Sequence, residues 1–119
     1  MPPSHREPDA LLPLTPVVYE ILVSLGDEER HGYGIMQEIE IRTGGSVNLR
    51  PGTLYRAVDR MLGLGLIEEP DARPDPEFDD ERRRYYRMTE FGRRVVSAEA
   101  ERLAAAVASA RSKNLLGKA

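Results

Sequence analysis

The C-terminal part of the chain most constrains its fold, because after Gly92 no proline or glycine interrupts the sequence until Gly117. Thr89 is a favourable helix cap, and Glu90 in the first turn complements the helix dipole. A helix from Glu90 to Leu116 would be about 40 Å long at roughly 1.5 Å per residue. Its apolar stripe would consist of Phe91, Val95, Ala98, Leu103, Ala106, Val107 and Ala110. A chain this short buries limited surface, so we expect any part of the stripe left bare to need a partner.

The remaining composition is that of a small globular protein. Its 119 residues are 40% hydrophobic and 31% charged, which fits one domain plus an appended element. No apolar run is long enough to span a bilayer, and the N-terminal MPPSHREPDA lacks the apolar core of a signal peptide. Cysteine is absent, which excludes disulfides, thiol nucleophiles and Cys-based metal sites. We therefore expect a cytoplasmic protein whose proline-rich, polar residues 1–12 form a flexible tail.

The charges are distributed in blocks along the chain. The net charge is −3 and the isoelectric point is near 5.4, which does not by itself indicate nucleic-acid binding. Segments 50–67 and 82–94 are nevertheless basic, with three and six arginines, whereas segment 68–81 has eight acidic residues against one arginine. Either basic block alone could be solvated surface charge. Two of them in an otherwise acidic chain favour a DNA-binding surface.

The first half of the chain predicts two helices. Thr15 followed by Pro16 is the arrangement of an N-cap and a first helical residue. The apolar face of this helix would consist of Leu14, Val17, Val18, Ile21, Leu22 and Leu25. The segment DEERHGYG is expected to be a loop. A second helix should run from about Tyr33 to Arg42 and end at the glycine pair 44–45.

The segment LRPGTLYRAVDRMLGLGLI, residues 49–67, predicts a third helix with two different faces. Pro51 suits its first turn, and Gly63 with Gly65 ends it. Apolar residues recur as in a half-buried helix, so the inward face would be Leu54, Ala57, Val58, Met61 and Leu62. The outward face would carry Thr53, Tyr55, Arg56, Asp59 and Arg60.

Two short strands should follow the third helix. Leu66–Glu68 and Arg84–Met88 are apolar or aromatic segments that would pair as an antiparallel hairpin. The connection between them has about 15 residues, is interrupted by prolines and is rich in Asp and Glu, and loops of this length are often functional. Phosphates would repel its acidic residues, so we expect the loop to swing away from DNA or to mask neighbouring arginines.

The order of three helices, a hairpin and a long helix is the winged helix-turn-helix plan. The expected fold class is therefore mainly α with a small β-hairpin (α+β), with a winged helix-turn-helix domain over 13–88 and a last helix over 89–117. In this plan the third helix enters the major groove and the hairpin contacts the backbone or the minor groove. Arginine pairs with guanine edges or phosphates, and Thr and Tyr donate to phosphates. The predicted DNA contacts are Arg50, Thr53, Tyr55, Arg56, Arg60, Arg82, Arg83, Arg84 and Arg87.

Simpler roles remain open for individual residues. Tyr55 could be a boundary residue that packs on the second helix, and Arg56 and Arg60 could be ordinary solvated arginines. The two histidines, His5 and His31, lack a partnered nucleophile, and we expect His31 to be a turn or cap residue. The acidic residues lack the paired setting of acid–base catalysis. The sequence therefore predicts no enzyme, no cofactor and no metal site.

The sequence resembles the PadR family of transcriptional regulators. The resemblance rests on LTPVVYEILVSLGDEERHGYGIMQEI in the first two helices, GTLYRAVDRMLGLGLI in the third, and RRRYYRMTEFGRR where the hairpin meets the last helix. It implies a homodimeric winged-helix repressor of the short branch, with one C-terminal dimerisation helix and a pseudo-palindromic operator in double-stranded DNA. Dimerisation is assigned to Phe91, Val95, Leu103, Val107 and Ala110.

The resemblance also implies where DNA and an effector would bind. The family's DNA-contacting helix corresponds to Pro51 through Arg56 and onward, and its basic wing corresponds to Arg82 through Arg87. The family frequently has proline where this chain has Arg56, which adds a charge to the reading face. Members often respond to small aromatic or lipophilic compounds, so an effector of that kind is expected to relieve repression.

A second hypothesis is a protein-binding adaptor. In this hypothesis the winged-helix head has lost DNA readout, and the acidic segment 68–81 docks a basic partner. A salt-dependent affinity for duplex DNA separates the two hypotheses, because each neutralised phosphate adds about −0.9 to the log–log slope.

Overall fold

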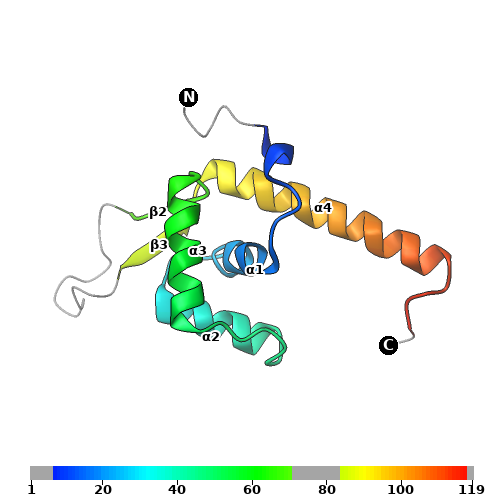
Figure 1. Cartoon of the computed structure of the whole chain (residues 1–119), viewed down its shortest axis with the longest axis horizontal. Coiled ribbons are helices and arrows are strands. Elements are labelled where there is room, and N and C mark those ends of the chain that lie inside the picture. The colour runs from blue at the N-terminus through cyan, green and yellow to red at the C-terminus, as the bar shows by residue number, and fades with distance from the viewer. Residues whose placement is uncertain (1–6, 71–83, 118–119) are drawn as a thin grey trace.

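The order of elements along the chain matches the winged-helix plan (Figure 1). The computed structural model describes residues 7–70 and 84–117. Its elements are the 3₁₀ helix η2 (Pro8–Leu11), α1 (Pro16–Ser24), β1 (Arg30–His31), α2 (Gly32–Arg42), α3 (Pro51–Gly63), β2 (Ile67–Glu68), β3 (Tyr85–Met88) and α4 (Glu90–Ser112). The predicted fold class, mainly α with a small sheet and a long last helix, is confirmed.

Threonine caps start the first and last α-helices where the sequence predicts them. The Thr15 hydroxyl accepts the Val18 N–H at 3.2 Å, and the Thr89 hydroxyl accepts the Gly92 N–H at 2.9 Å. Each cap satisfies a backbone donor that the helix itself leaves without a partner. Local chemistry therefore fixes where α1 and α4 begin.

The sheet has three antiparallel strands in the order β1–β3–β2. The hairpin of β2 and β3 was predicted, and it pairs Ile67 with Met88. The strand β1 was not predicted, since residues 27–34 were expected to be a loop, but Arg30 pairs with Tyr86 of β3. A strand of two residues carries no alternation of apolar and polar side chains, so periodicity gives no sign of it.

The base of α4 closes the core of the head. The buried hydrophobic residues are Ile21, Leu22, Leu25, Ile35, Ile39, Leu54, Val58, Met61, Leu66, Ile67, Tyr86, Phe91 and Val95. Phe91 is 3% exposed and Val95 is fully buried, so both belong to this core. Their assignment to the dimer interface is thereby corrected. Helical periodicity identifies an apolar face, but it does not identify the surface that covers that face.

The segment before α1 lies against α4, which corrects part of the flexible tail predicted for residues 1–12. The 3₁₀ helix η2 contacts α4 (Figure 1), and Leu11 and Leu12 pack on the core. The Leu14 N–H then donates to the Glu99 carboxylate at 2.9 Å. Apolar side chains between the prolines hold this segment in place, and composition alone does not distinguish them from a tail.

Beyond the head, α4 continues as a projecting helix (Figure 1). It ends at Ser112 rather than at the predicted Leu116, and its 23 residues form a rod of about 35 Å. Leu103 and Val107 of the predicted stripe are 37% and 44% exposed, and Ala110 is partly buried. The head therefore leaves the outer half of the apolar stripe largely bare.

Candidate nucleic-acid interface

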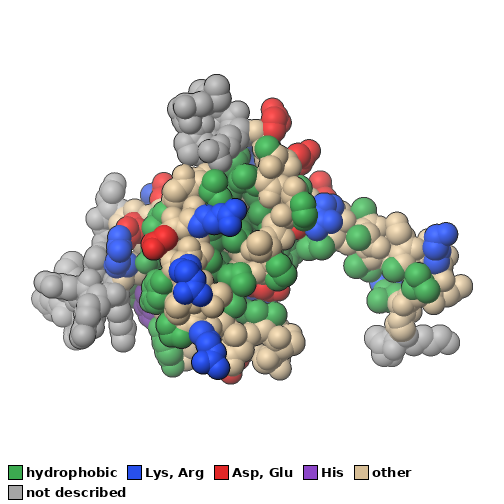
Figure 2. Space-filling model, in the orientation of Figure 1, with side chains coloured by type: hydrophobic (Ala, Val, Ile, Leu, Met, Phe, Trp, Pro, Cys, Tyr) green, Lys and Arg blue, Asp and Glu red, His purple; other side chains and the backbone are tan. Residues whose placement is uncertain are grey.

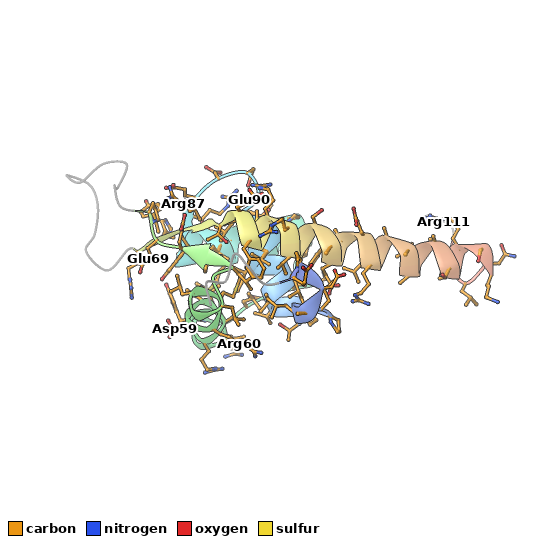
Figure 3. The ribbon with its side chains drawn as sticks, turned by 90° about the horizontal axis from the view of Figure 1, so that it is seen from above. Asp59, Arg60, Glu69, Arg87, Glu90 and Arg111 are labelled. Carbon is orange, nitrogen blue, oxygen red and sulfur yellow. The ribbon has the colours of Figure 1, made fainter. Side chains whose placement is uncertain are left out.

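Helix α3 has one buried face and one exposed face, as its sequence predicts. Its fully buried side chains are Leu54, Val58 and Met61. Arg56, Asp59 and Arg60 are exposed on the other side, and Thr53 is partly buried. Basic side chains follow α3 on the face shown in Figure 2, and Figure 3 shows Asp59 and Arg60 projecting together away from the head. This face is open to a ligand along the length of the helix.

The first turn of α3 differs from that of the other three α-helices. The side chains of Thr15, His31 and Thr89 cap α1, α2 and α4, and each accepts a backbone N–H. Arg50 occupies the cap position of α3 and makes no side-chain cap bond, and Pro51 follows it. The next two N–H groups have no acceptor within the helix. Groups of this kind at a helix start bind phosphate oxygens readily.

Tyr55 joins α3 to the start of α2. A side-chain carbon built on Gly32 would lie 2.7 Å from the ring carbon that bears the Tyr55 hydroxyl, and closer still to the hydroxyl oxygen. The ring therefore rests on the bare backbone of Gly32, with 44% of the tyrosine exposed. The structure thus shows the packing role that the sequence left open. Contact between Tyr55 and DNA stays a prediction.

His31 links α2 to the wing formed by β2 and β3. Its Nδ1 accepts the Gly34 N–H at 3.0 Å, which confirms the predicted cap role and requires this nitrogen to be unprotonated. Its ring also meets the Tyr85 ring edge-on, with 5.4 Å between centroids. The histidine therefore has a structural role at the junction of α2 and β3.

Arg84, directly before β3, and Arg87, within it, face opposite sides of the sheet. Arg84 has the same parity as the buried Tyr86, and its Nε and Nη2 bind Glu69 at 2.8 and 2.7 Å. Arg87 has the opposite parity and binds Glu68 at 2.8 Å. Figure 3 shows Arg87 on the side of the molecule away from the exposed face of α3. The predicted wing residues are therefore separated, with Arg84 on the side of Tyr86 and Arg87 on the side away from α3.

Acidic neighbours surround the charge of Arg84. Hydrogen bonds to Glu69, and then Coulombic attraction to the same carboxylate, raise the pKa of Arg84. Asp59 on α3 makes a smaller contribution in the same direction, which agrees with a position of Arg84 beside the exposed face of α3. Two other predicted contacts, Arg82 and Arg83, lie outside the described residues.

A buried carboxylate at the base of α4 is a feature that the sequence interpretation missed. Glu99 is 1% exposed, and its oxygens accept hydrogen bonds from the Leu14 N–H and from the Arg102 guanidinium. Hydrogen bonding to Arg102 lowers the pKa of Glu99, against the opposing effect of burial. The sequence does contain a sign of this pair. Arg102 follows Glu99 by three residues, and Glu99 lies on the same helix face as Val95.

Several ionisable side chains of the described residues form ion pairs with one another. Arg42 binds Glu20 and Glu38 at 2.7 and 2.9 Å, for example. Within residues 7–70 and 84–117, no three His, Cys, Asp or Glu side chains gather to hold a metal ion. Across the same residues, no helix combines the length and the apolar character needed to cross a bilayer.

The head, the exposed face of α3 and the projecting α4 together define a winged-helix protein with one appended helix. The family model described as "Transcriptional regulator PadR-like family" matches residues 21–98. The chain belongs to this family of transcriptional regulators, whose members are not enzymes. Protein X of Lysinibacillus sphaericus, which is uncharacterised, is 35% identical over 77 residues, or 65% of this chain and 68% of that protein.

Solved structures share the fold. A transcriptional regulator from Clostridium thermocellum matches with a TM-score of 0.66 at 27% identity, over 81% of this chain and 87% of that one. A PadR family regulator from Clostridium difficile matches with a TM-score of 0.66 at 23% identity, over 81% and 95%. Bacillus subtilis PadR, in complex with operator DNA, matches with a TM-score of 0.59 at 17% identity, over 86% and 64%. These likenesses agree with the fold predicted from the order of elements.

Proposed function

We propose that this chain is a sequence-specific DNA-binding regulator that reads its operator with α3. The main support is the exposed face of α3, where Arg56 and Arg60 project from a helix whose other face is core. The second helix of a helix-turn-helix unit is the one that enters the major groove, and arginine recognises guanine edges there. A protein of the same fold, Bacillus subtilis PadR, is seen in a complex with operator DNA.

Around this face, the proposed phosphate contacts are Arg50, Thr53 and Arg84. Arg50 is the N-cap of α3 and Thr53 lies in its first turn, beside N–H groups with no acceptor in the helix. Arg84 lies on the wing next to α3. Contacts of this kind fix the register of the protein on the duplex rather than its sequence preference. Further contacts expected from the sequence are Tyr55, Arg82 and Arg83.

Two copies of the chain are proposed to pair through the outer half of α4. Leu103 and Val107 are exposed there, and pairing would remove them and Ala110 from water. A two-fold dimer presents two copies of α3 to one side of the DNA. The operator would then be pseudo-palindromic, with half-sites about one helical turn, near 10 base pairs or a multiple, apart.

The proposed mode of action is a repressor relieved by a small lipophilic or aromatic compound. The family resemblance supports this mode, and a regulator of this kind would act in the cytoplasm, on DNA. A depression beside the middle of α4, where the helix leaves the head, is lined by Leu14, Tyr19 and Leu103, beside Glu99 and Arg102. A compound bound there would contact both the head and the projecting helix, so it could change the angle between them.

The adaptor hypothesis has less support. It requires the acidic segment 68–81 to be available to a basic partner. Glu68 and Glu69, at the start of that segment, bind Arg87 and Arg84 of the same chain. Residues 71–83 lie outside the described part of the chain.

A DNA titration tests the proposed function. Fluorescence anisotropy would follow binding to the DNA upstream of the chain's own gene, and to duplexes selected from a random pool, at two salt concentrations. The regulator should bind saturably, and its binding should persist in the presence of scrambled competitor DNA. Its affinity should fall with salt by a log–log slope of about −0.9 per phosphate contact. An adaptor should bind none of these duplexes.

A matched pair of double variants locates the reading surface. Arg56→Ala with Arg60→Ala should abolish operator binding and leave the dimer intact. Arg111→Ala with Lys113→Ala removes the same charge at the far end of α4 (Figure 3) and should keep the wild-type affinity. Equal affinities of the two double variants would show that α3 does not read the operator.

A further inference from the structure

The ion pair between Glu69 and Arg84 links the two arms of the wing beside α3. The Arg84 Nε donates to one Glu69 oxygen at 2.8 Å, and Nη2 donates to the other at 2.7 Å. The two side chains are 58% and 35% exposed, so the pair is accessible to a ligand. A carboxylate held in this way presents two oxygens to the guanidinium, the same arrangement that a phosphate offers.

We propose that Glu69 competes with a DNA phosphate for Arg84 and thereby sets the affinity of the wing for DNA. The proposal rests on the proposed DNA-binding function. In the free protein, Glu69 occupies the hydrogen-bonding edge of Arg84. A phosphate must displace this carboxylate before the wing can hold the backbone next to α3. Glu69 is therefore an affinity-determining residue that need not itself contact DNA.

Asp59, on α3, also opposes the approach of a phosphate to Arg84. Its side chain is exposed on α3 and adds a second negative charge near Arg84. A phosphate that approaches Arg84 is repelled by both carboxylates until Glu69 is displaced. Removing the charge of Glu69 would free the guanidinium and would also remove part of this repulsion.

The neighbouring pair on the same hairpin provides an internal comparison. Glu68 binds Arg87 at 2.8 Å, and Arg87 also lies 3.9 Å from Glu29. Both wing pairs are exposed, but Arg87 lies on the side of the molecule away from the exposed face of α3 (Figure 3). A phosphate bound along α3 can reach Arg84 but not Arg87. Removing the charge of Glu68 should therefore leave DNA affinity unchanged.

The test compares Glu69→Gln with Glu68→Gln by fluorescence anisotropy on the operator. Each variant removes one negative charge from adjacent residues of the wing. Glu69→Gln should bind about three- to fivefold more tightly than the wild type, a gain that matches the modest strength of exposed ion pairs. Glu68→Gln should stay within about twofold. Adding Arg84→Ala to Glu69→Gln should cancel the gain and reduce the salt slope by about 0.9.

The outcomes separate this inference from the proposed function. Equal gains in DNA affinity for the two single variants would show that the net charge of the wing sets the affinity. This result would overturn the proposed competition between Glu69 and a phosphate. A wild type that binds DNA while Glu69→Gln shows no gain would overturn the inference and leave the function in place. A wild type that binds no duplex at low salt would overturn both. Unchanged melting temperatures would show that both variants keep the fold.

Discussion

Gly92, in the first turn of α4, lies where no side chain fits. A carbon built on Gly92 would be 3.0 Å from the Leu66 carbonyl carbon and closer still to its oxygen. The obstacle is backbone, so rotation of a side chain cannot relieve it. Gly92→Ala therefore requires a movement on the order of 1 Å between α4 and the turn that follows α3. Leu66 itself is fully buried, so the surrounding core resists this movement.

The cost of the movement can be worked from the contacts of the Leu66 carbonyl. This oxygen accepts the Thr89 N–H at 3.1 Å, and it also lies 3.1 Å from the Thr89 hydroxyl, whose nearer acceptor is the Gly65 carbonyl at 2.6 Å. Weakening the backbone hydrogen bond costs about 0.5–1.5 kcal/mol, and overpacking adds about 1–3 kcal/mol. The preference of a helix for alanine over glycine returns about 0.5–1 kcal/mol. We expect Gly92→Ala to lower the free energy of unfolding by about 2 kcal/mol.

Urea unfolding followed by circular dichroism would measure this change, at one fixed protein concentration because the stability of the proposed dimer would depend on concentration. The matched control is Gly63→Ala at the end of α3, where no atom lies within 4 Å of an added carbon. This control should be neutral or stabilised by up to about 1 kcal/mol. If Gly92→Ala proves as stable as Gly63→Ala, the close approach at Leu66 does not constrain α4.

Three other changes probe the junctions of the molecule. Gly32→Ala should displace the Tyr55 ring, lowering stability by about 1 kcal/mol and weakening operator binding in anisotropy; unchanged binding would remove Tyr55 from the interface. The pKa of Glu99 lies below the ordinary 4.5, so its carboxylate adds stability above that pH and loses it as the pH falls. Wild type should therefore lose more stability than Glu99→Gln in thermal melts between about pH 5 and pH 3, and parallel curves would contradict this. Leu103→Asp with Val107→Asp should give a folded monomer by light scattering, whereas a dimer of unchanged mass would place the interface elsewhere.

Elements fixed by local chemistry could be predicted from the sequence. Thr15 and Thr89 cap helices, Pro51 starts α3, and the apolar period of α3 matches its buried face. The paired segments of the hairpin also follow from their β-favouring residues. In each case the signal lies within a few residues of the structure that it specifies.

Relations between distant segments could not be predicted in the same way. Phe91 and Val95 lie on the stripe as predicted, but only the folded head shows that it covers them. Glu99 interrupts an apolar face, and its partner, the Leu14 N–H, belongs to a segment whose composition resembles a tail. The two-residue alternation of side chains along a strand predicts that Arg84 and Arg87 face opposite sides, but the basic segment 82–94 was interpreted as one surface.

The hydrogen bond from Leu14 to Glu99 joins residues 85 positions apart, and it has a consequence for synthesis on the ribosome. The head cannot close before Phe91, Val95 and Glu99 have been made, because the first two complete its core and Glu99 holds the segment before α1. At about 5–20 residues per second, roughly 4–15 s separate the synthesis of α1 from that of Glu99. During that interval α1, and then α2 and α3 as each is made, expose apolar surface that chaperones and proteases recognise. The smallest segment able to fold as this head therefore extends past the strands of the wing, into the first turns of α4.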